Sequence, residues 1–266
     1  MRYGFAVIAF VTILAGVAPA LAADFARWSF STSVNYSVGD YGTDSDTTIV
    51  YVPFTFGVRP IERLSISLTV PFIYLSSDDV VVTGGGVAVR KRGTGTSTTT
   101  RRSTSESGIG DILLKGSFIV LEERGWIPEI APYLKTKFPT ADEDRGLGTG
   151  EFDETIGVDL SKRLMERLFG YLTLAYTFIG DPPGAELRDS FGWSVGAAYA
   201  VTPRFPVFAF LDGATAISPG QSDPVELRAG AEYRLTHALK LTGAVTRGLT
   251  EGAADWGLSG GLTLRF

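Results

Sequence analysis

Alternation of apolar and small polar residues is the feature of this sequence that most restricts its fold. In residues 28–38, WSFSTSVNYSV, serine or asparagine occupies every odd position. The even positions carry Trp28, Phe30, Thr32, Val34, Tyr36 and Val38. A period of two places successive side chains on opposite faces of an extended strand. The segment is therefore predicted to be a β-strand with one apolar and one polar face.

The same alternation recurs along the chain and predicts twelve strands. They are expected at residues 26–38, 47–58, 63–74, 108–121, 127–138, 151–161, 171–178, 190–201, 205–214, 225–235, 239–249 and 256–266. Most have about ten residues or more, the length that a tilted strand needs to cross a bilayer. Segment 205–214 is apolar on both faces, and a turn of helix is expected only in SKRLMERL, residues 161–168.

The connections between these strands alternate in length. Short ones are expected at 59–62, 122–126, 202–204 and 236–238, and longer polar ones at 39–46, 75–107, 139–150, 179–189, 215–224 and 250–255. Short turns at one rim and long loops at the other are typical of outer-membrane barrels. An even number of strands places both ends of the barrel on the short-turn, periplasmic side.

The first residues predict export from the cytoplasm. Arg2 precedes an apolar stretch at 5–17, which is followed by Pro19 and by the small-residue pattern at 20–22. This arrangement is typical of a secretory signal peptide, and the apolar stretch is short for a membrane-anchoring helix. We therefore expect a signal peptide at 1–22 and one barrel domain at 23–266.

Two environments for the apolar faces compete: a second sheet in a soluble sandwich, or lipid around a barrel. Aromatic residues lie near strand ends, as in the girdles of membrane barrels; they are Trp28, Tyr74, Phe138, Trp256 and Phe266. The opposite faces mix charges with Gly, Ser and Thr, which suits a barrel interior. The predicted fold is all-β, a transmembrane antiparallel β-barrel of about twelve strands in a bacterial outer membrane, and the terminal Phe266 is expected to engage the barrel-assembly machinery.

Charged residues on the polar faces are the candidates for lining a lumen. They are Asp111, Lys115, Glu129, Lys135, Lys137, Glu151, Asp153, Asp159, Glu226, Arg228, Glu232 and Arg234. Both signs occur close together, so two interpretations stay open. The charges either form salt bridges that brace the barrel, or form a constriction that selects solutes by charge and size.

Prolines inside the strand patterns need an explanation because each lacks a donor for the sheet ladder. Pro53 and Pro71 lie on neighbouring predicted strands. They mark either bulges or bilayer-boundary positions, or a loosened wall through which an apolar ligand leaves sideways. Unbroken pairing between these two strands would exclude the second interpretation.

The sequence gives little support for catalysis or for a cofactor. There is no cysteine, which excludes disulfides, thiol nucleophiles and cysteine metal sites. The one histidine, His237, lies in a predicted periplasmic turn without a recognisable triad. We therefore expect no catalytic residues, no metal and no cofactor, and a formal net charge of −5 does not suggest nucleic acid as a partner.

The longest loop, at 76–107, carries five basic residues, Arg90, Lys91, Arg92, Arg101 and Arg102, among Gly, Ser and Thr. The default interpretation is a flexible, solvated loop. Three further roles stay open: contact with lipopolysaccharide phosphates, folding into the mouth, or outward extension of the adjacent strands. Outer-membrane lipid, lipopolysaccharide and a small-molecule solute are thus the expected partners.

Three segments resemble a bacterial outer-membrane family assigned to the MetA pathway of phenol degradation. They are GIGDILLKGSFIV at 108–120, APYLKTKFPTADED at 131–144 and LGTGEFDETIGVDLSKRL at 147–164. The family shows a similar Gly-x-Gly-Asp strand, a Lys-x-Pro-Thr segment and a later Gly-x-Gly, although its members often have Gly where this chain has Ala141. The resemblance implies a barrel that passes small aromatic or other hydrophobic compounds, and it supplies no binding residues.

The expected function is that of a passive pore or transporter for small molecules. The alternative is a structural or adhesive barrel whose lumen is closed by its own salt bridges. An enzyme is not expected.

Overall fold

Strands form nearly everywhere that the alternation predicts them. The computed structural model describes residues 27–41, 46–77, 104–182 and 187–266. The strands are β1 (Trp28–Gly39), β2 (Thr47–Ile61), β3 (Leu64–Ser77), β4 (Thr104–Ile109), β5 (Ile112–Phe118), β6 (Glu129–Phe138), β7 (Asp153–Met165), β8 (Leu168–Phe178), β9 (Ser190–Thr202), β10 (Phe205–Ala214), β11 (Val225–Arg234), β12 (Leu239–Gly248) and β13 (Trp256–Arg265). Segment 161–165 continues β7, so the helical turn expected there is wrong.

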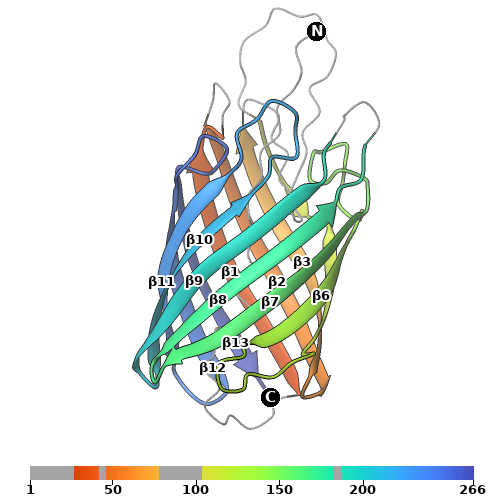
Figure 1. Ribbon diagram of the computed structural model, residues 1–266. Coiled ribbons are helices and arrows are strands. Elements are labelled where there is room, and N and C mark those ends of the chain that lie inside the picture. Colours follow the sequence, from red (N-terminus) through yellow and green to blue (C-terminus); the bar gives the residue numbers. More distant parts are fainter. Residues whose placement is uncertain (1–26, 42–45, 78–103, 183–186) are drawn as a thin grey trace, which may run out of the picture.

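The strands close into one antiparallel barrel (Figure 1). Strands that follow one another in sequence are paired, apart from the successive pieces β4 and β5, and β1 pairs with β13, which leaves no open edge at this seam. The N–H of Trp28 donates to the carbonyl of Phe266, and the N–H of Phe266 donates back, with N···O distances of 2.8 and 3.0 Å. Both ends of the barrel therefore lie at one rim, together with the short turns (Figure 1).

The fourth strand of the barrel consists of two pieces, β4 and β5, and this makes thirteen strand segments into a twelve-stranded barrel. β4 pairs with residues 72–77 of β3 and β5 pairs with residues 64–69, so the interruption lies opposite Pro71. Proline has no N–H to donate to the ladder. The backbone bond that remains runs from the N–H of Gly110 to the carbonyl of Pro71, at 2.9 Å.

Pro53 interrupts a different ladder. The register between β1 and β2 omits Ser33 and Val34, and the side-chain amide of Asn35 donates to the carbonyl of Tyr51 at 3.0 Å. β2 and β3 stay paired on both sides of the Pro53–Pro71 pair. The hypothesis that these prolines loosen the wall between β2 and β3 is therefore wrong, because each proline affects the ladder on its other side.

Large apolar side chains cover the outside of the barrel. Val34, Leu134 and Leu258 are 54, 62 and 62% exposed, whereas a sandwich would bury them against a second sheet. Since a closed barrel satisfies its backbone internally, this apolar exterior can face lipid. The predicted membrane barrel is confirmed, and the sandwich is excluded.

Among the residues that the structure describes, no helix is long and apolar enough to cross a membrane. The predicted signal peptide and most of the basic loop, including its five cationic residues, lie outside the described residues. The part of loop 76–107 that is described extends the wall, because residues 104–107 pair with residues 74–77.

Candidate functional site

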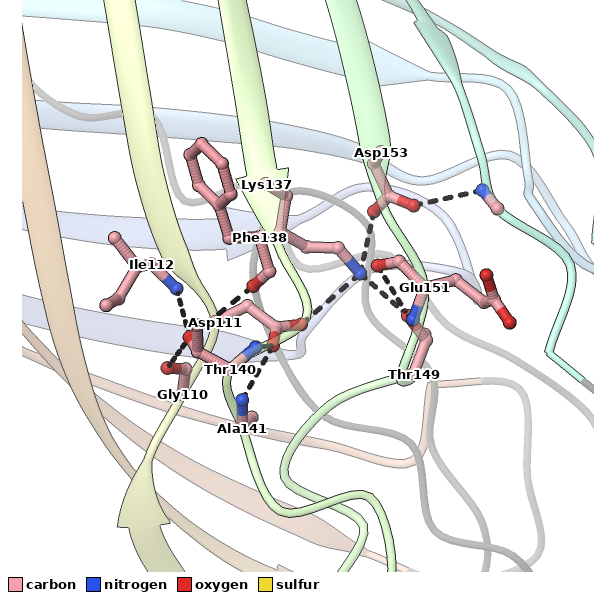
Figure 2. Close-up of polar contacts among 11 residues, drawn as sticks. Gly110, Asp111, Ile112, Lys137, Phe138, Thr140, Ala141, Thr149, Glu151 and Asp153 are labelled. Atoms are coloured by element: carbon pink, nitrogen blue, oxygen red, sulfur yellow. Dashed lines mark hydrogen bonds and ion pairs between the residues drawn. The ribbon is translucent and has the colours of Figure 1, made fainter.

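Charged side chains gather on the inner face of the barrel, opposite the exposed apolar positions. Of the candidates from the sequence, eleven lie in or directly beside β5, β6, β7 and β11: Asp111, Lys115, Glu129, Lys135, Lys137, Asp153, Asp159, Glu226, Arg228, Glu232 and Arg234. Glu151 differs, because β7 begins only at Asp153. Its carboxylate points away from Lys137 (Figure 2), and its backbone instead hydrogen-bonds to Thr149.

Three of the buried groups form one cluster around the Lys137 ammonium (Figure 2). Its Nζ lies 3.3 Å from Asp111 Oδ2 and 3.0 Å from Asp153 Oδ2, and it donates to Thr149 Oγ1 at 2.7 Å. Asp111, Lys137 and Asp153 are only 2, 4 and 6% exposed. Two carboxylates therefore share one ammonium in a site that excludes most water.

The break between β4 and β5 is what brings Asp111 into this cluster. Its carboxylate accepts the backbone N–H groups of Thr140 and Ala141 at 3.0 and 2.9 Å. The Thr140 hydroxyl in turn accepts the N–H of Ile112 at 2.9 Å. These bonds hold the segment after β6 against the wall at the point where the ladder is interrupted (Figure 2).

Gly148 completes this arrangement because a side chain would not fit there. A Cβ at this position would lie 2.7 Å from the Cβ of Ala141 and 2.9 Å from Asp111 Oδ1. The three sequence segments that carried the family resemblance thus meet around one ammonium. The sequence alone named Asp111, Lys137 and Asp153 as lumen candidates, but it did not indicate that they lie together.

A second group, around Lys115, lies on the same wall but nearer the short-turn rim. Lys115 and Lys135 are directly opposite each other on β5 and β6, an arrangement that is unfavourable for two like charges. Lys115 is compensated by Asp159, with an N···O distance of 3.2 Å, and it lies 3.8 Å from the centre of the Tyr133 ring. Within the described residues Lys135 forms no ion pair, which makes it a cation on the inner face without a direct counter-charge.

On the opposite side of the barrel Arg228 forms the third group. Its guanidinium binds Asp212 through two nitrogens, at 3.0 and 3.3 Å, and lies 5.0 Å from the centre of the Phe210 ring. Ser194 donates a further hydrogen bond to Asp212, which is 2% exposed. Asp212 was not among the candidates because the segment around it is apolar on both faces. The available signal was its place in the alternation, because residues two apart lie on one face of a strand and Asp212 therefore shares the face of Phe208 and Phe210.

The fourth group is the pair of Lys240 and Glu232, at 2.8 Å. Lys240 was not a candidate because the alternation in 239–249 is irregular. Glu129 accepts from Ser161 at 3.5 Å, and within the described residues neither Glu129 nor Arg234 takes part in an ion pair.

Apolar side chains also occupy the inner face, in addition to the charges, Gly, Ser and Thr that were expected there. One cluster near the loop rim contains Tyr41, Ile49, Tyr51, Ile73, Leu75, Leu147 and Ala254. Burial raises the pKa of the Tyr41 hydroxyl, which donates to Ser37 Oγ at 3.0 Å. A second cluster consists of Ala198, Phe208, Phe210 and Ala244, with Tyr171 packed against it.

Among the described residues, the contacts of these groups are ion pairs, hydrogen bonds and ring contacts. His237 is exposed in the turn between β11 and β12. In the part of the chain that the structure describes, no three His, Cys, Asp or Glu side chains are placed so that they could hold a metal ion.

Comparison with known proteins points to outer-membrane channels. The family model described as "Putative MetA-pathway of phenol degradation" matches residues 32–266. No curated protein sequence matches the chain. Among solved structures, an outer membrane channel from Pseudomonas putida F1 is similar with a TM-score of 0.67 and 15% identity, over 94% of this chain and 100% of the channel.

Two further structures show the same fold at lower similarity. The KdgM porin has a TM-score of 0.55 and 9% identity, over 90% of this chain and 99% of the porin. The toluene transporter TbuX of Ralstonia pickettii has a TM-score of 0.51 and 10% identity, over 91% of this chain and 90% of the transporter. At these identities the similarity establishes the fold, which is that of bacterial outer-membrane barrels.

Proposed function

Because the chain belongs to the family described as "Putative MetA-pathway of phenol degradation", we propose that it is a passive pore for small molecules in the bacterial outer membrane. The observation that supports the proposal is that the outer and inner faces of the closed barrel wall differ in the chemistry of their side chains. Large apolar side chains are exposed outside, while ion pairs, hydroxyls and two apolar clusters lie inside. A wall of this kind separates lipid from a lumen with its own chemistry.

The proposed solutes are small aromatic or other hydrophobic molecules. Inner-face side chains such as Ile73, Tyr171 and Phe208 belong to two packed apolar clusters, which a lumen for sugars or salts does not need. Two structures with the same fold are named as a toluene transporter and as a monoaromatic hydrocarbon channel. These names belong to those proteins, and the inner apolar clusters are the feature of this chain that supports a similar solute class.

The second candidate is a structural or adhesive barrel with a closed lumen. It is favoured by the number of inner charges that already have a partner, since Lys137, Arg228 and Lys240 each bind a buried carboxylate. Such pairs brace a wall regardless of whether solute passes. The two candidates differ in whether the purified barrel conducts.

Single-channel conductance in planar bilayers tests the proposal. We expect the refolded protein to give discrete current steps, and we expect benzyl alcohol to block part of the current more strongly than glycerol at the same concentration. Absence of any current would favour the closed barrel. Equal effects of the two alcohols would contradict the proposed solute class.

Lys135 offers the sharpest variant, because it carries charge on the inner face without an ion pair to break. Lys135→Glu should shift the reversal potential toward cation selectivity, since the change replaces a positive by a negative charge beside Lys115. Glu166→Gln, in the turn between β7 and β8, is a control at the rim. If both variants select ions like the wild type, Lys135 does not face the conducting path.

Two partner predictions accompany the pore. Engagement of the barrel-assembly machinery through Phe266 stays a prediction, and so does contact of the long basic loop with lipopolysaccharide. Phe266 is 69% exposed and lies directly after β13.

A further inference from the structure

Four exposed arginines lie along the short-turn rim, each within two residues of a large exposed apolar side chain. The four pairs, which we call the rim collar, are Arg27 with Trp28, Arg124 with Trp126, Arg167 with Met165, and Arg204 with Phe205. They lie at the start of β1, in the β5–β6 connection and in the β7–β8 and β9–β10 turns. Because successive strands of the barrel are antiparallel, all four positions are at the same end of the barrel.

The apolar members of the collar are exposed at the height where lipid meets water. Trp126 is 86% exposed, and Trp28, Met165 and Phe205 are exposed as well. The Phe205 ring lies 6.5 Å from the ring of Tyr233, between centres, and both rings are on the outside of the barrel. Aromatic side chains in this position form the girdle that membrane barrels place at the interface.

The four arginines of the collar carry positive charge that no ion pair among the described residues neutralises. Other cations at this rim bind Glu122 and Glu123, with N···O distances of 2.6 and 2.8 Å, so these two carboxylates are already engaged. Glu62 and Glu166 are the further carboxylates in the described turns of the rim. The exposed arginines of the collar therefore outnumber the carboxylates left to bind them.

The long-loop rim has the opposite charge. In the described part of its connections acidic residues outnumber basic ones, as in ADEDRG at 141–146. Arg247 lies there 4.5 Å from the centre of the Trp256 ring, and 3.8 Å from Asp255 Oδ1. This arginine next to an exposed aromatic ring has its own counter-charge, unlike the arginines of the collar.

The connection between β5 and β6 holds its part of the collar in place. The Glu123 carboxylate binds the Lys162 ammonium at 2.8 Å and accepts the backbone N–H of Arg163 at 3.2 Å, which ties the connection to the end of β7. Arg124 and Trp126 stay exposed on either side of the turn glycine. An arginine and an indole that are already held side by side lose less conformational freedom when they bind a ligand.

We propose that the rim collar binds the phosphate groups of anionic phospholipids in the periplasmic leaflet of the membrane. A guanidinium binds a phosphate through two parallel hydrogen bonds and is only weakly hydrated, which favours this contact at an interface. The apolar neighbour of each arginine inserts between lipids beside the same headgroup. Basic side chains close to an anionic membrane surface gain affinity for it. The collar is thus a lipid-binding surface, and the proposed pore does not depend on it.

Quenching of tryptophan fluorescence by brominated lipids tests the two rims separately. The chain has four tryptophans. Trp28→Phe, Trp193→Phe and Trp256→Phe leave Trp126 alone at the short-turn rim, and a matched protein retains Trp256 alone at the long-loop rim. Each full chain is refolded into phosphatidylcholine vesicles that contain the same fraction of brominated phosphatidylglycerol or of brominated phosphatidylcholine. Because bromine quenches only a nearby indole, each protein reports the lipid at its own rim in either orientation.

We expect Trp126 to report about fivefold enrichment of phosphatidylglycerol over phosphatidylcholine, the effect of one basic residue near an anionic surface. Trp256 should report no enrichment. Arg124→Gln should remove most of the enrichment at Trp126, whereas Arg247→Gln, the matched change beside Trp256, should alter nothing. Sodium chloride at about 0.5 M should weaken the enrichment, because salt screens exposed charges.

Heat-modifiable mobility in gels verifies that each variant is a folded barrel. If the proteins with a single tryptophan do not fold, native mass spectrometry of the chain with all its tryptophans counts the bound phosphatidylglycerol. Replacement of the four collar arginines by glutamine should then lower this count to that of phosphatidylcholine.

The inference is overturned if both lipids quench Trp126 equally, if Arg124→Gln changes nothing, or if Trp256 shows the same preference as Trp126. It is also overturned if inorganic phosphate removes the preference at an ionic strength at which chloride leaves it intact. The arginines would then bind free phosphate and not the headgroup of a lipid. In the mass-spectrometric measurement, an unchanged count for the glutamine variant has the same meaning.

Lipid binding is measured without current, so its failure and that of the pore are distinct. A barrel that enriches phosphatidylglycerol at Trp126 but carries no current refutes the pore and retains the collar. A barrel that conducts but shows no lipid preference retains the pore and refutes the collar.

Discussion

Removal of the Lys137 ammonium is the most informative perturbation of the inner charges. Lys137→Met keeps a side chain of similar length but leaves Asp111 and Asp153 buried together without the cation that both bind. Loss of one partner from a buried ion pair costs about 3–5 kcal/mol, because the remaining charge stays out of water. Here two carboxylates lose their partner, so the upper part of this range is expected.

Urea unfolding of the barrel in lipid vesicles, followed by tryptophan fluorescence and gel mobility, measures this cost. With a denaturant dependence of about 3 kcal/mol per molar urea, a loss of 3–5 kcal/mol lowers the midpoint by roughly 1–1.7 M. Asp153→Asn alone should cost much less, since it leaves a one-to-one pair of Lys137 with Asp111.

A triple variant provides the decisive control. Asp111→Asn, Lys137→Met and Asp153→Asn together remove every charge, and replacement of a whole buried ion pair by neutral groups is often close to neutral in stability. We expect the triple variant to recover at least half of the loss seen with Lys137→Met. The reasoning is refuted if Lys137→Met unfolds like the wild type, or if the triple variant is no more stable than the single one.

Three further predictions test other parts of the structure. Val34→Arg should destabilise the barrel by about 2–4 kcal/mol because it faces lipid near mid-height, whereas Ser33→Arg on the inner face should cost less and lower the conductance; equal costs in urea titrations would reverse the assignment of the faces. Arg228→Met leaves its buried carboxylate partner with only a hydroxyl donor, so a loss of about 3–5 kcal/mol is expected in the same assay, and an unchanged midpoint would show that the pair is not desolvated. In the turn after β5, the hydrogen bond from Lys162 holds the pKa of Glu123 below its usual value, so the pair stabilises the fold above the unfolded-state pKa and loses this effect as pH falls through the lowered one. The stability difference between wild type and Glu123→Gln should therefore be at most about 0.5 kcal/mol at pH 7 and should vanish once the pH has fallen below the lowered pKa, and a difference that grows in acid would contradict the sign.

Strand positions were predictable because they depend on a local signal. Alternation over about ten residues specifies an extended segment and its apolar face without knowledge of any partner. For β10 the predicted and observed limits coincide at 205–214, although this segment was the least regular. The short-turn rim followed from loop lengths alone.

Interruptions of the wall were harder to locate. The prolines were visible in the sequence, but which ladder each one breaks depends on which side of the strand its missing N–H faces. Pro71 turned out to oppose the break at Gly110, and this break places Asp111 where it binds two backbone N–H groups.

The sequence by itself determined that this chain forms amphipathic strands, and how many, because alternation is a property of neighbouring residues. Only the tertiary structure decided which inner residues meet. The register and tilt of each strand set the height of its side chains in the barrel, and an alternation with a period of two specifies neither. Lys137 therefore binds carboxylates 26 residues before it and 16 residues after it, and Arg228 binds a carboxylate 16 residues before it.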